Sequence, residues 1–260
     1  MPDARLRLEL ETLHPPLANA PSEGFASVDW LRDWLYSRLI VASPQCLLPE
    51  SAWNNLSGPA RLLQRFEDNE GGVWCSGASA LFAALCELFG FRTASIHAGD
   101  PRGAASHVFT LVEVVAPGGP VWSVQDAYFN YTVVGLGGEH LDYFSFLDAL
   151  HTSAPAGPVA SNGPSRHCWV LYHPERDPYN EAQWEFVFRR VRNPQPLPAG
   201  RVKAEFHQWN LGILNEPIFQ HYLEWLCAHG GSTDPIRLLG FPFFWNAPPD
   251  LDARLQRRTG

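Results

Sequence analysis

The chain has 260 residues, of which 45% are hydrophobic and 18% charged, so it can fold around a large core. Its formal net charge of −8 and the lack of a Lys/Arg-rich run argue against binding to nucleic acid or anionic membrane surfaces. The first residues carry charges throughout, and no apolar run approaches the ~18 residues that span a bilayer. We therefore expect a single cytoplasmic domain without a signal peptide.

The five cysteines are an odd number with no close pair, which predicts reduced thiols rather than a disulfide framework. They are Cys46, Cys75, Cys86, Cys168 and Cys227. The histidines show no H-E-x-x-H spacing, and no C-x-x-C motif occurs. The sequence therefore predicts neither a metal site nor a cofactor. The neighbouring pair His167 and Cys168 is expected to be structural, because adjacent strand residues point to opposite faces.

The first part of the chain is predicted to be mainly helical. It opens with residues 5–13, where apolar and charged side chains alternate, a pattern that predicts an edge strand. Ser27 or Asp29 is expected to cap a helix that runs to Leu39. A second helix is expected at residues 59–66, with Pro59 in its first turn.

The later part of the chain is predicted to supply most of the sheet. Strands are expected at residues 92–98, 106–115, 121–126, 167–172 and 184–191, and helices at residues 139–150 and 215–230. Residues 153–165 are rich in Ala, Pro, Gly and Ser, which predicts a surface loop, with a mobile lid or a linker as alternatives. The predicted class is α+β, with a core at about residues 53–150 and a C-terminal extension at about residues 166–260.

A glycine-rich segment leads into a cysteine at the start of an apolar helix. Gly71 and Gly72 precede Cys75, and Leu81 and Leu85 continue the helical spacing. A thiol in the first turn of a helix lies at the positive end of the helix dipole, which favours the nucleophilic thiolate. The alternative is that Cys75 is a small buried residue, as free cysteines often are.

Two titratable residues lie on the strands of a predicted hairpin. If Pro117 and Gly118 are the central turn residues, Phe109 faces Asp126, and His107 lies diagonal to Asp126 on the same face. A carboxylate on one imidazole nitrogen leaves the other nitrogen to accept a thiol proton. Together with Cys75, these residues predict a catalytic triad. The alternative is that His107 begins its strand and is solvated, while Asp126 ends its strand and caps the following loop.

These residues, in this order, resemble the transglutaminase-like superfamily of thiol enzymes. The resemblance covers about residues 71–126 and is carried by Cys75 at a helix start, Gly90-Phe91-Arg92, His107 opening an apolar strand, Glu113, and Trp122 four residues before Asp126. It implies a papain-like core in which the nucleophile-bearing helix packs on an antiparallel sheet. It also implies that Cys75 is the nucleophile, His107 the base and Asp126 its partner. The chain differs from the family pattern at Val73, Phe109 and Ala127, where Gly, Trp and Pro are often found.

The predicted function is cysteine-dependent acyl transfer through a Cys75 thioester. The expected partners are a peptide or small-molecule acyl donor and an amine acceptor. An amide or peptide hydrolase with the same triad, and a non-catalytic binding module with this fold, are the alternatives. The oxyanion would be bound by the Cys75 N–H and one upstream side chain. The candidates for that side chain and for the cleft wall are Trp53, Asn54, Asn55, Gln64, Trp74, Tyr128 and Phe129.

Overall fold

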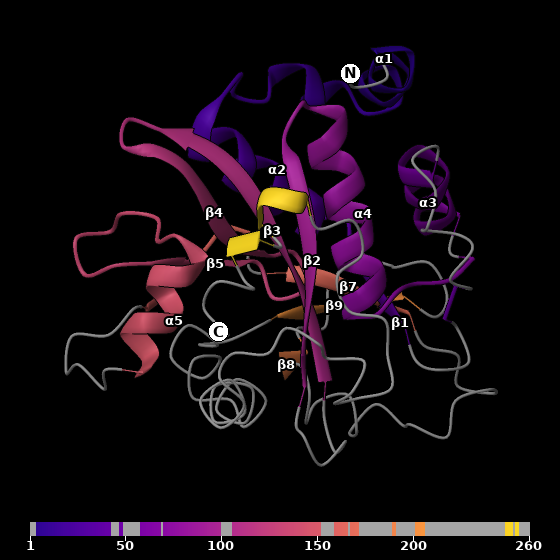
Figure 1. Ribbon diagram of the computed structural model, residues 1–260. Helices are drawn as coiled ribbons and strands as arrows, with labels where there is room; N and C mark the ends of the chain where they lie inside the picture. The colour runs from indigo at the N-terminus through magenta and orange to yellow at the C-terminus, as the bar shows by residue number, and fades with distance from the viewer. Residues whose placement is uncertain are drawn as a thin grey trace.

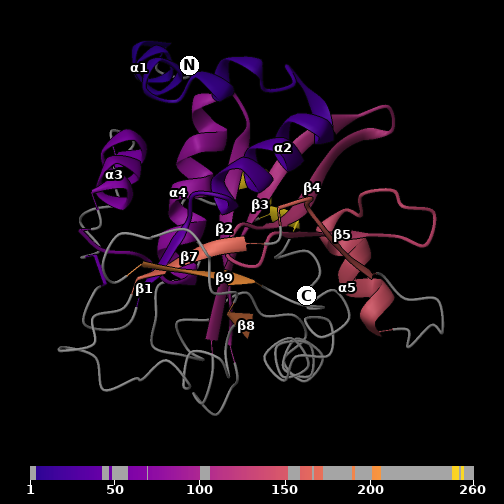
Figure 2. The same ribbon diagram turned by 180° about the vertical axis from the view of Figure 1, so that it is seen from behind.

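The computed structural model is a mixed helix and sheet fold, as predicted (Figures 1 and 2). It describes residues 4–42, 47–48, 58–68, 70–99, 106–151, 159–165, 167–171, 189–190, 201–205, 248–251 and 253–254. Within these described residues the structure has the helices α1 (Ala4–Leu13), α2 (Gly24–Tyr36), α3 (Gly58–Glu67), α4 (Cys75–Leu88) and α5 (Tyr143–His151), with a 3-10 helix at Pro15–Asn19. Among the described helices, none has the length and apolar character needed to cross a membrane.

The centre of the fold is a five-stranded antiparallel sheet in the order β2-β3-β4-β5-β6. Its strands are β2 (Arg92–Gly99), β3 (Ser106–Ala116), β4 (Gly119–Asp126), β5 (Tyr131–Val134) and β6 (Val159–Asn162). The β3–β4 hairpin has the predicted register, because Ala116 pairs with Gly119 and Thr110 with Gln125. A positive φ of 116° at Gly119 allows the chain to leave this tight turn.

Helices cover both faces of this sheet (Figures 1 and 2). Helix α4 packs on β2 and β3, and α2 packs beside it on β3 and β4. The buried hydroxyls of Ser79 on α4 and Thr110 on β3 are 2.7 Å apart, which ties the helix to the sheet. Phe109 points to the opposite face, where its ring lies 6.4 Å from that of Tyr143 on α5. The sheet therefore lies between α2 and α4 on one side and α5 on the other.

A second sheet joins distant parts of the chain in the order β1-β7-β9-β8. Its strands are β1 (Ile40–Ala42), β7 (His167–Leu171), β8 (Arg189–Arg190) and β9 (Arg201–Glu205). Strand β1 pairs in parallel with β7, so the end of the helical N-terminal part is bonded directly to the predicted C-terminal extension.

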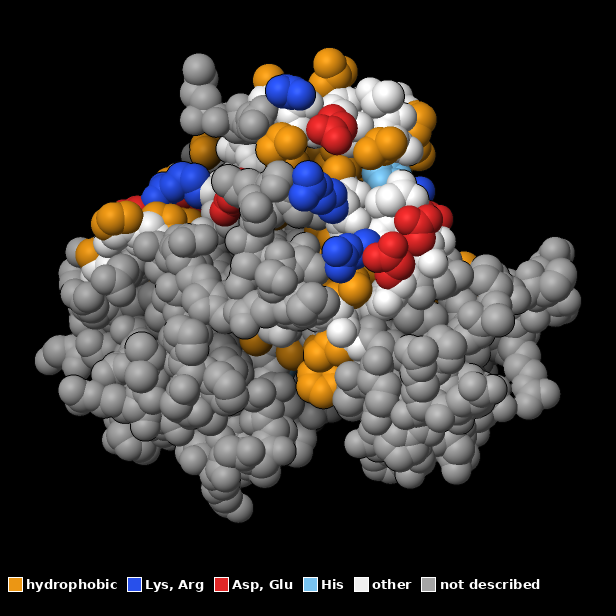
Figure 3. Space-filling model, turned by 90° about the vertical axis from the view of Figure 1, so that its right-hand side faces the viewer, with side chains coloured by type: hydrophobic (Ala, Val, Ile, Leu, Met, Phe, Trp, Pro, Cys, Tyr) orange, Lys and Arg blue, Asp and Glu red, His pale blue; other side chains and the backbone are white. Residues whose placement is uncertain are grey.

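The predicted edge strand at residues 5–13 is wrong, because these residues form α1. The alternating pattern also places Leu6 and Leu10 one helical turn apart, and Leu10 is fully buried. Arg7 and Glu11 form an ion pair of 2.8 Å at the i,i+4 spacing of a helix. Leu8 is left 65% exposed, and hydrophobic and charged side chains are interspersed over the upper part of the surface in Figure 3.

Several other boundaries differ from the prediction. Helix α2 begins at Gly24, so Ser27 and Asp29 lie inside it rather than at its cap. Helix α5 begins at Tyr143 instead of residue 139, and Asp142 caps it by accepting the Phe144 N–H at 3.0 Å.

The two sheets also contain strands that were not predicted from the sequence. Strand β6 lies within the segment predicted to be a loop and pairs with β5, which was not predicted either. Strand β1 was also missed; it has only three residues, too few for a visible period. The predicted helix at residues 215–230 and most of the predicted strand at residues 184–191 lie outside the described residues.

Candidate active site

Backbone hydrogen bonds on both sides of the glycine-rich segment fix the position of Cys75. The Val73 N–H donates to the Ile40 carbonyl at 2.8 Å, and the Leu48 N–H donates to the Gly72 carbonyl at 2.9 Å. The chain then turns at Trp74, and Cys75 is the first residue of α4, as predicted. Its thiol is free and partly exposed. The N-cap residue Trp74 makes no side-chain cap hydrogen bond, and the first N–H groups of such a helix are suited to bind an oxyanion.

His107 and Asp126 meet in the way that the hairpin register predicted. The imidazole Nε2 contacts Asp126 Oδ2. Both residues are buried, with 4% exposure for His107 and none for Asp126. Burial of this pair in an apolar surrounding strengthens the hydrogen bond and fixes the ring orientation.

The other side of the imidazole ring faces the cysteine. The Cys75 thiol is close enough to His107 to raise the pKa of the imidazole. Because Nε2 contacts Asp126, Nδ1 is the ring nitrogen left to exchange a proton with a thiol. Burial lowers the pKa of His107, but the charges and hydrogen bonds of Asp126 and Cys75 outweigh it and raise that pKa to about 10. The environment thus favours the imidazolium form of His107.

The turn after Asp126 completes the surroundings of His107. Asp126 Oδ1 accepts the backbone N–H groups of Tyr128 at 2.9 Å and Phe129 at 3.0 Å. The Phe129 ring lies 4.9 Å from the imidazole ring, and the Tyr128 ring lies 6.0 Å from it. One short turn therefore orients the carboxylate and supplies two aromatic rings around the base.

Tyr128 also lies close to the nucleophile. Burial and the nearby charges of Cys75, Cys168 and Asp126 raise the pKa of its phenol well above the ordinary value. The hydroxyl therefore keeps its proton and remains a hydrogen-bond donor. The structure brings this predicted cleft residue next to the site.

The remaining oxyanion candidates divide into three groups. Trp74 adjoins Cys75 in the chain and is 43% exposed, so it borders the opening to the thiol. Gln64 is exposed on α3, and its amide donates to Asp68, just beyond the end of that helix, at 3.1 Å. Trp53, Asn54 and Asn55 lie outside the described residues.

Two other cysteines have structural surroundings. Cys86 is fully buried on α4, and burial raises the pKa of its thiol. Cys168 is also buried, and burial raises the pKa of this thiol as well. Both thiols are inert by this criterion. Cys46 and Cys227 lie outside the described residues, and within the described part no His, Cys, Asp or Glu cluster suited to a metal ion occurs.

Comparison with known proteins finds no relative of this chain. No family model matches the chain, and neither a curated protein nor a solved structure does. The site holds a partly exposed thiol, an imidazole near it and a carboxylate bonded to the imidazole. This is the arrangement of nucleophile, base and orienting group that supports covalent acyl chemistry.

Proposed function

We propose that this protein is a cysteine-dependent acyltransferase of the transglutaminase-like, papain-like kind. The observation that carries the proposal is the buried imidazole of His107, which is bonded to Asp126 and has its pKa raised by both Asp126 and the nearby Cys75 thiol. The helix that begins at Cys75 and packs on an antiparallel sheet supports the same assignment. Because a thiolate nucleophile works only while reduced, we place the enzyme in the cytoplasm.

The first half of the reaction makes a thioester. The Cys75 thiolate attacks the acyl carbonyl carbon, a C–S bond forms, and the carbonyl oxygen becomes an oxyanion. When the oxyanion collapses, the bond to the leaving group breaks and the His107 imidazolium gives that group its proton. Asp126 keeps the ring oriented and stabilises its positive charge before this transfer.

The second half releases the acyl group to an amine. The amine nitrogen attacks the thioester carbon, and the now neutral His107 takes the proton from that nitrogen. The C–S bond then breaks, which leaves an amide product and regenerates the Cys75 thiolate beside the imidazolium. Atoms and charges balance without a metal or a redox partner.

Two donors are suited to the oxyanion formed in both halves. The Cys75 backbone N–H lies in the first turn of α4, and the Tyr128 phenol, whose pKa is raised, keeps its proton. Such donors stabilise charge that develops only in the transition state, and removal of one costs about 10² to 10³ in rate. Tyr128→Phe is the variant that reports on this role.

Aromatic side chains around the thiol favour transfer over hydrolysis. Trp74 borders the opening, while Tyr128 and Phe129 pack around His107. An apolar wall limits access of water to the thioester but admits the apolar part of an amine substrate. A peptide or small amide is the proposed acyl donor.

The test is incubation of the purified protein with a panel of peptide amides and small thioesters, with and without a primary amine, followed by mass spectrometry. We expect an amine adduct that forms with the wild type, is lost in Cys75→Ala and is retained in Cys86→Ala. Release of free acid alone at saturating amine would assign hydrolysis. Donors that bind without being consumed would assign a binding module instead.

A further inference from the structure

The turn that carries Asp126 has little support from the sheet. Strands β4 and β5 pair only through Gln125–Thr132 and Asp126–Tyr131, next to the turn. The turn nevertheless holds Asp126, Tyr128 and Phe129 around His107. A carboxylate that orients a catalytic base must be held in place by further contacts.

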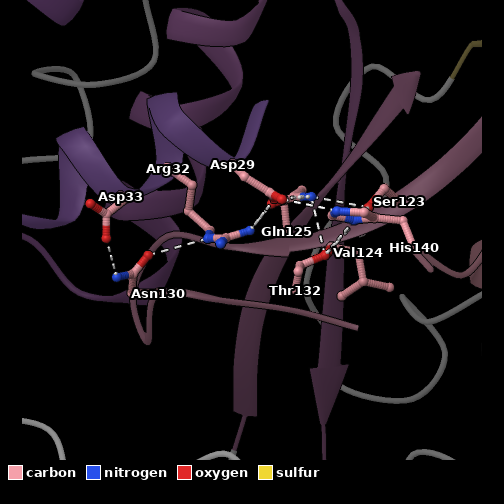
Figure 4. A network of polar contacts seen from close by, with 9 residues as sticks. All are labelled: Asp29, Arg32, Asp33, Ser123, Val124, Gln125, Asn130, Thr132 and His140. Atoms are coloured by element: carbon pink, nitrogen blue, oxygen red, sulfur yellow. Dashed lines mark hydrogen bonds and ion pairs between the residues drawn. The ribbon is translucent and has the colours of Figure 1, made fainter. Parts of the chain in front are cut away.

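Those contacts come from α2, on the other side of the turn (Figure 4). Arg32 is 2% exposed, and its Nε donates to Asn130 Oδ1 at 3.2 Å. Its Nη1 donates to Gln125 Oε1 and, at 2.8 Å, to Asp29 Oδ1. One guanidinium therefore bridges the residue just before Asp126 and the residue at the far end of the same turn.

Asn130 is the more constrained of these two anchors. Its φ of 55° lies in the left-handed region, which a non-glycine residue adopts only at a cost. Its buried amide donates to Asp33 Oδ1 at 2.9 Å and to the Ser165 carbonyl at 2.7 Å. The Asn130 side chain thus has hydrogen bonds in three directions, which hold the turn in this strained conformation.

Simple charge balance does not account for the choice of arginine. Asp29 already receives His140 Nε2 at 2.9 Å and Gln125 Nε2 at 3.3 Å, so it does not depend on Arg32 alone. A lysine at position 32 would keep a positive charge beside Asp29. Only a planar guanidinium presents donors to Gln125, Asn130 and Asp29 at the same time.

We propose that Arg32 is a positioning residue that clamps both ends of the turn from Asp126 to Asn130, so that the Asp126 carboxylate stays directed at His107. This role rests on the proposed function of the Cys75 site. Arg32 contacts neither the thiol nor the imidazole; it acts through Gln125 and Asn130 on the carboxylate between them.

The test compares Arg32→Lys and Asn130→Gly with wild type, because glycine tolerates the left-handed turn but lacks the clamped amide. His140→Gln is the control, since it removes the imidazole partner of Asp29 and leaves Gln125 and Asn130, at the two ends of the turn, unchanged. The readouts are the His107 titration by NMR of ¹⁵N-histidine-labelled protein, the rate of Cys75 alkylation and the thermal midpoint.

In both clamp variants we expect the His107 titration midpoint to fall by about one pH unit or more, as when a partner charge moves away. Cys75 alkylation near neutral pH should slow by about tenfold or more. His140→Gln should keep the wild-type titration and rate. Clamp variants with a lower thermal midpoint but a wild-type His107 titration would overturn the proposal and leave Arg32 a purely structural role.

The same measurements distinguish failure of the Arg32 proposal from failure of the proposed acyltransferase function. If wild-type Cys75 reacts no faster than an ordinary thiol, the proposed function fails. If wild-type Cys75 is highly reactive and remains so in Arg32→Lys and Asn130→Gly, only the clamp is refuted.

Discussion

Replacing Asp126 with asparagine isolates the charge that acts on His107. The Asp126 side chain is fully buried, with Oδ1 accepting two backbone N–H groups of its own turn and Oδ2 facing the imidazole. Asparagine has nearly the same shape, and its carbonyl oxygen can keep both backbone bonds. The turn should therefore stay in place while the negative charge beside His107 disappears.

The size of the effect follows from the environment of the imidazole. Burial alone lowers the pKa of His107, and the groups that raise it to about 10 are Asp126 and Cys75. Without the carboxylate we expect this pKa to return toward its ordinary value of 6.5. At pH 7.5 the imidazolium population would then fall from more than about 99% to about 10%. A positioned acid–base group contributes about 10² to 10⁴ in rate, so Asp126→Asn should lose acyl transfer by that factor.

The assay is the rate of amide formation from a fixed acyl donor and amine, measured beside the far-UV circular dichroism spectrum of each protein. Asp126→Asn should show a wild-type spectrum and the predicted loss of rate. An active variant, folded and within about twofold of the wild-type rate, would refute the reasoning, because general acid–base catalysis could not then depend on this charge.

Three further predictions concern stability. Because the pKa of His107 is raised from 6.5 to about 10, its contribution to the free energy of unfolding is complete below pH 6.5 and is lost as the pH rises through about 10; urea denaturation should show this decline in wild type, and the same slope in His107→Gln would contradict it. In Gly163→Ala the new Cβ would lie 2.8 Å from Asn130 Oδ1, so we expect the free energy of unfolding to fall by about 1–3 kcal/mol. An unchanged thermal midpoint would contradict this packing argument. Thr110→Val leaves the buried Ser79 hydroxyl without its 2.7 Å partner, so the free energy of unfolding measured by urea denaturation should fall by about 1–3 kcal/mol. Adding Ser79→Ala should recover part of this loss. Wild-type stability of Thr110→Val would argue against the role of this hydrogen bond.

The central geometry of the site was readable in the sequence because it depends on local rules. A two-residue turn at Pro117 and Gly118 fixes the register of its hairpin, and the register fixes which side chains share a face. His107 and Asp126 therefore meet as expected. The spacing of Leu81 and Leu85 likewise predicted the helix that begins at Cys75.

Other features depended on contacts that no local pattern encodes. Residues 5–13 fit a strand and a helix equally well by spacing, and packing of Leu10 into the core decided for the helix. Arg32 and Asn130 are 98 positions apart, and only the tertiary fold brings them together. One signal in the sequence indicated this contact. Arg32 lies between apolar residues of a predicted helix, Leu31 and the Trp34–Leu35 pair, and an arginine buried there needs a polar partner.

The most direct test of the central claim is the pH dependence of Cys75 alkylation, followed by mass spectrometry on the intact, folded protein. If His107 holds the thiol proton, Cys75 should react nearly as fast at pH 6 as at pH 8, whereas His107→Ala should slow about tenfold for each pH unit below 8, as an ordinary thiol does. Buried Cys86 and Cys168 should stay unlabelled and confirm that the fold is intact. A wild-type Cys75 whose rate falls with pH as steeply as that of His107→Ala would contradict the account.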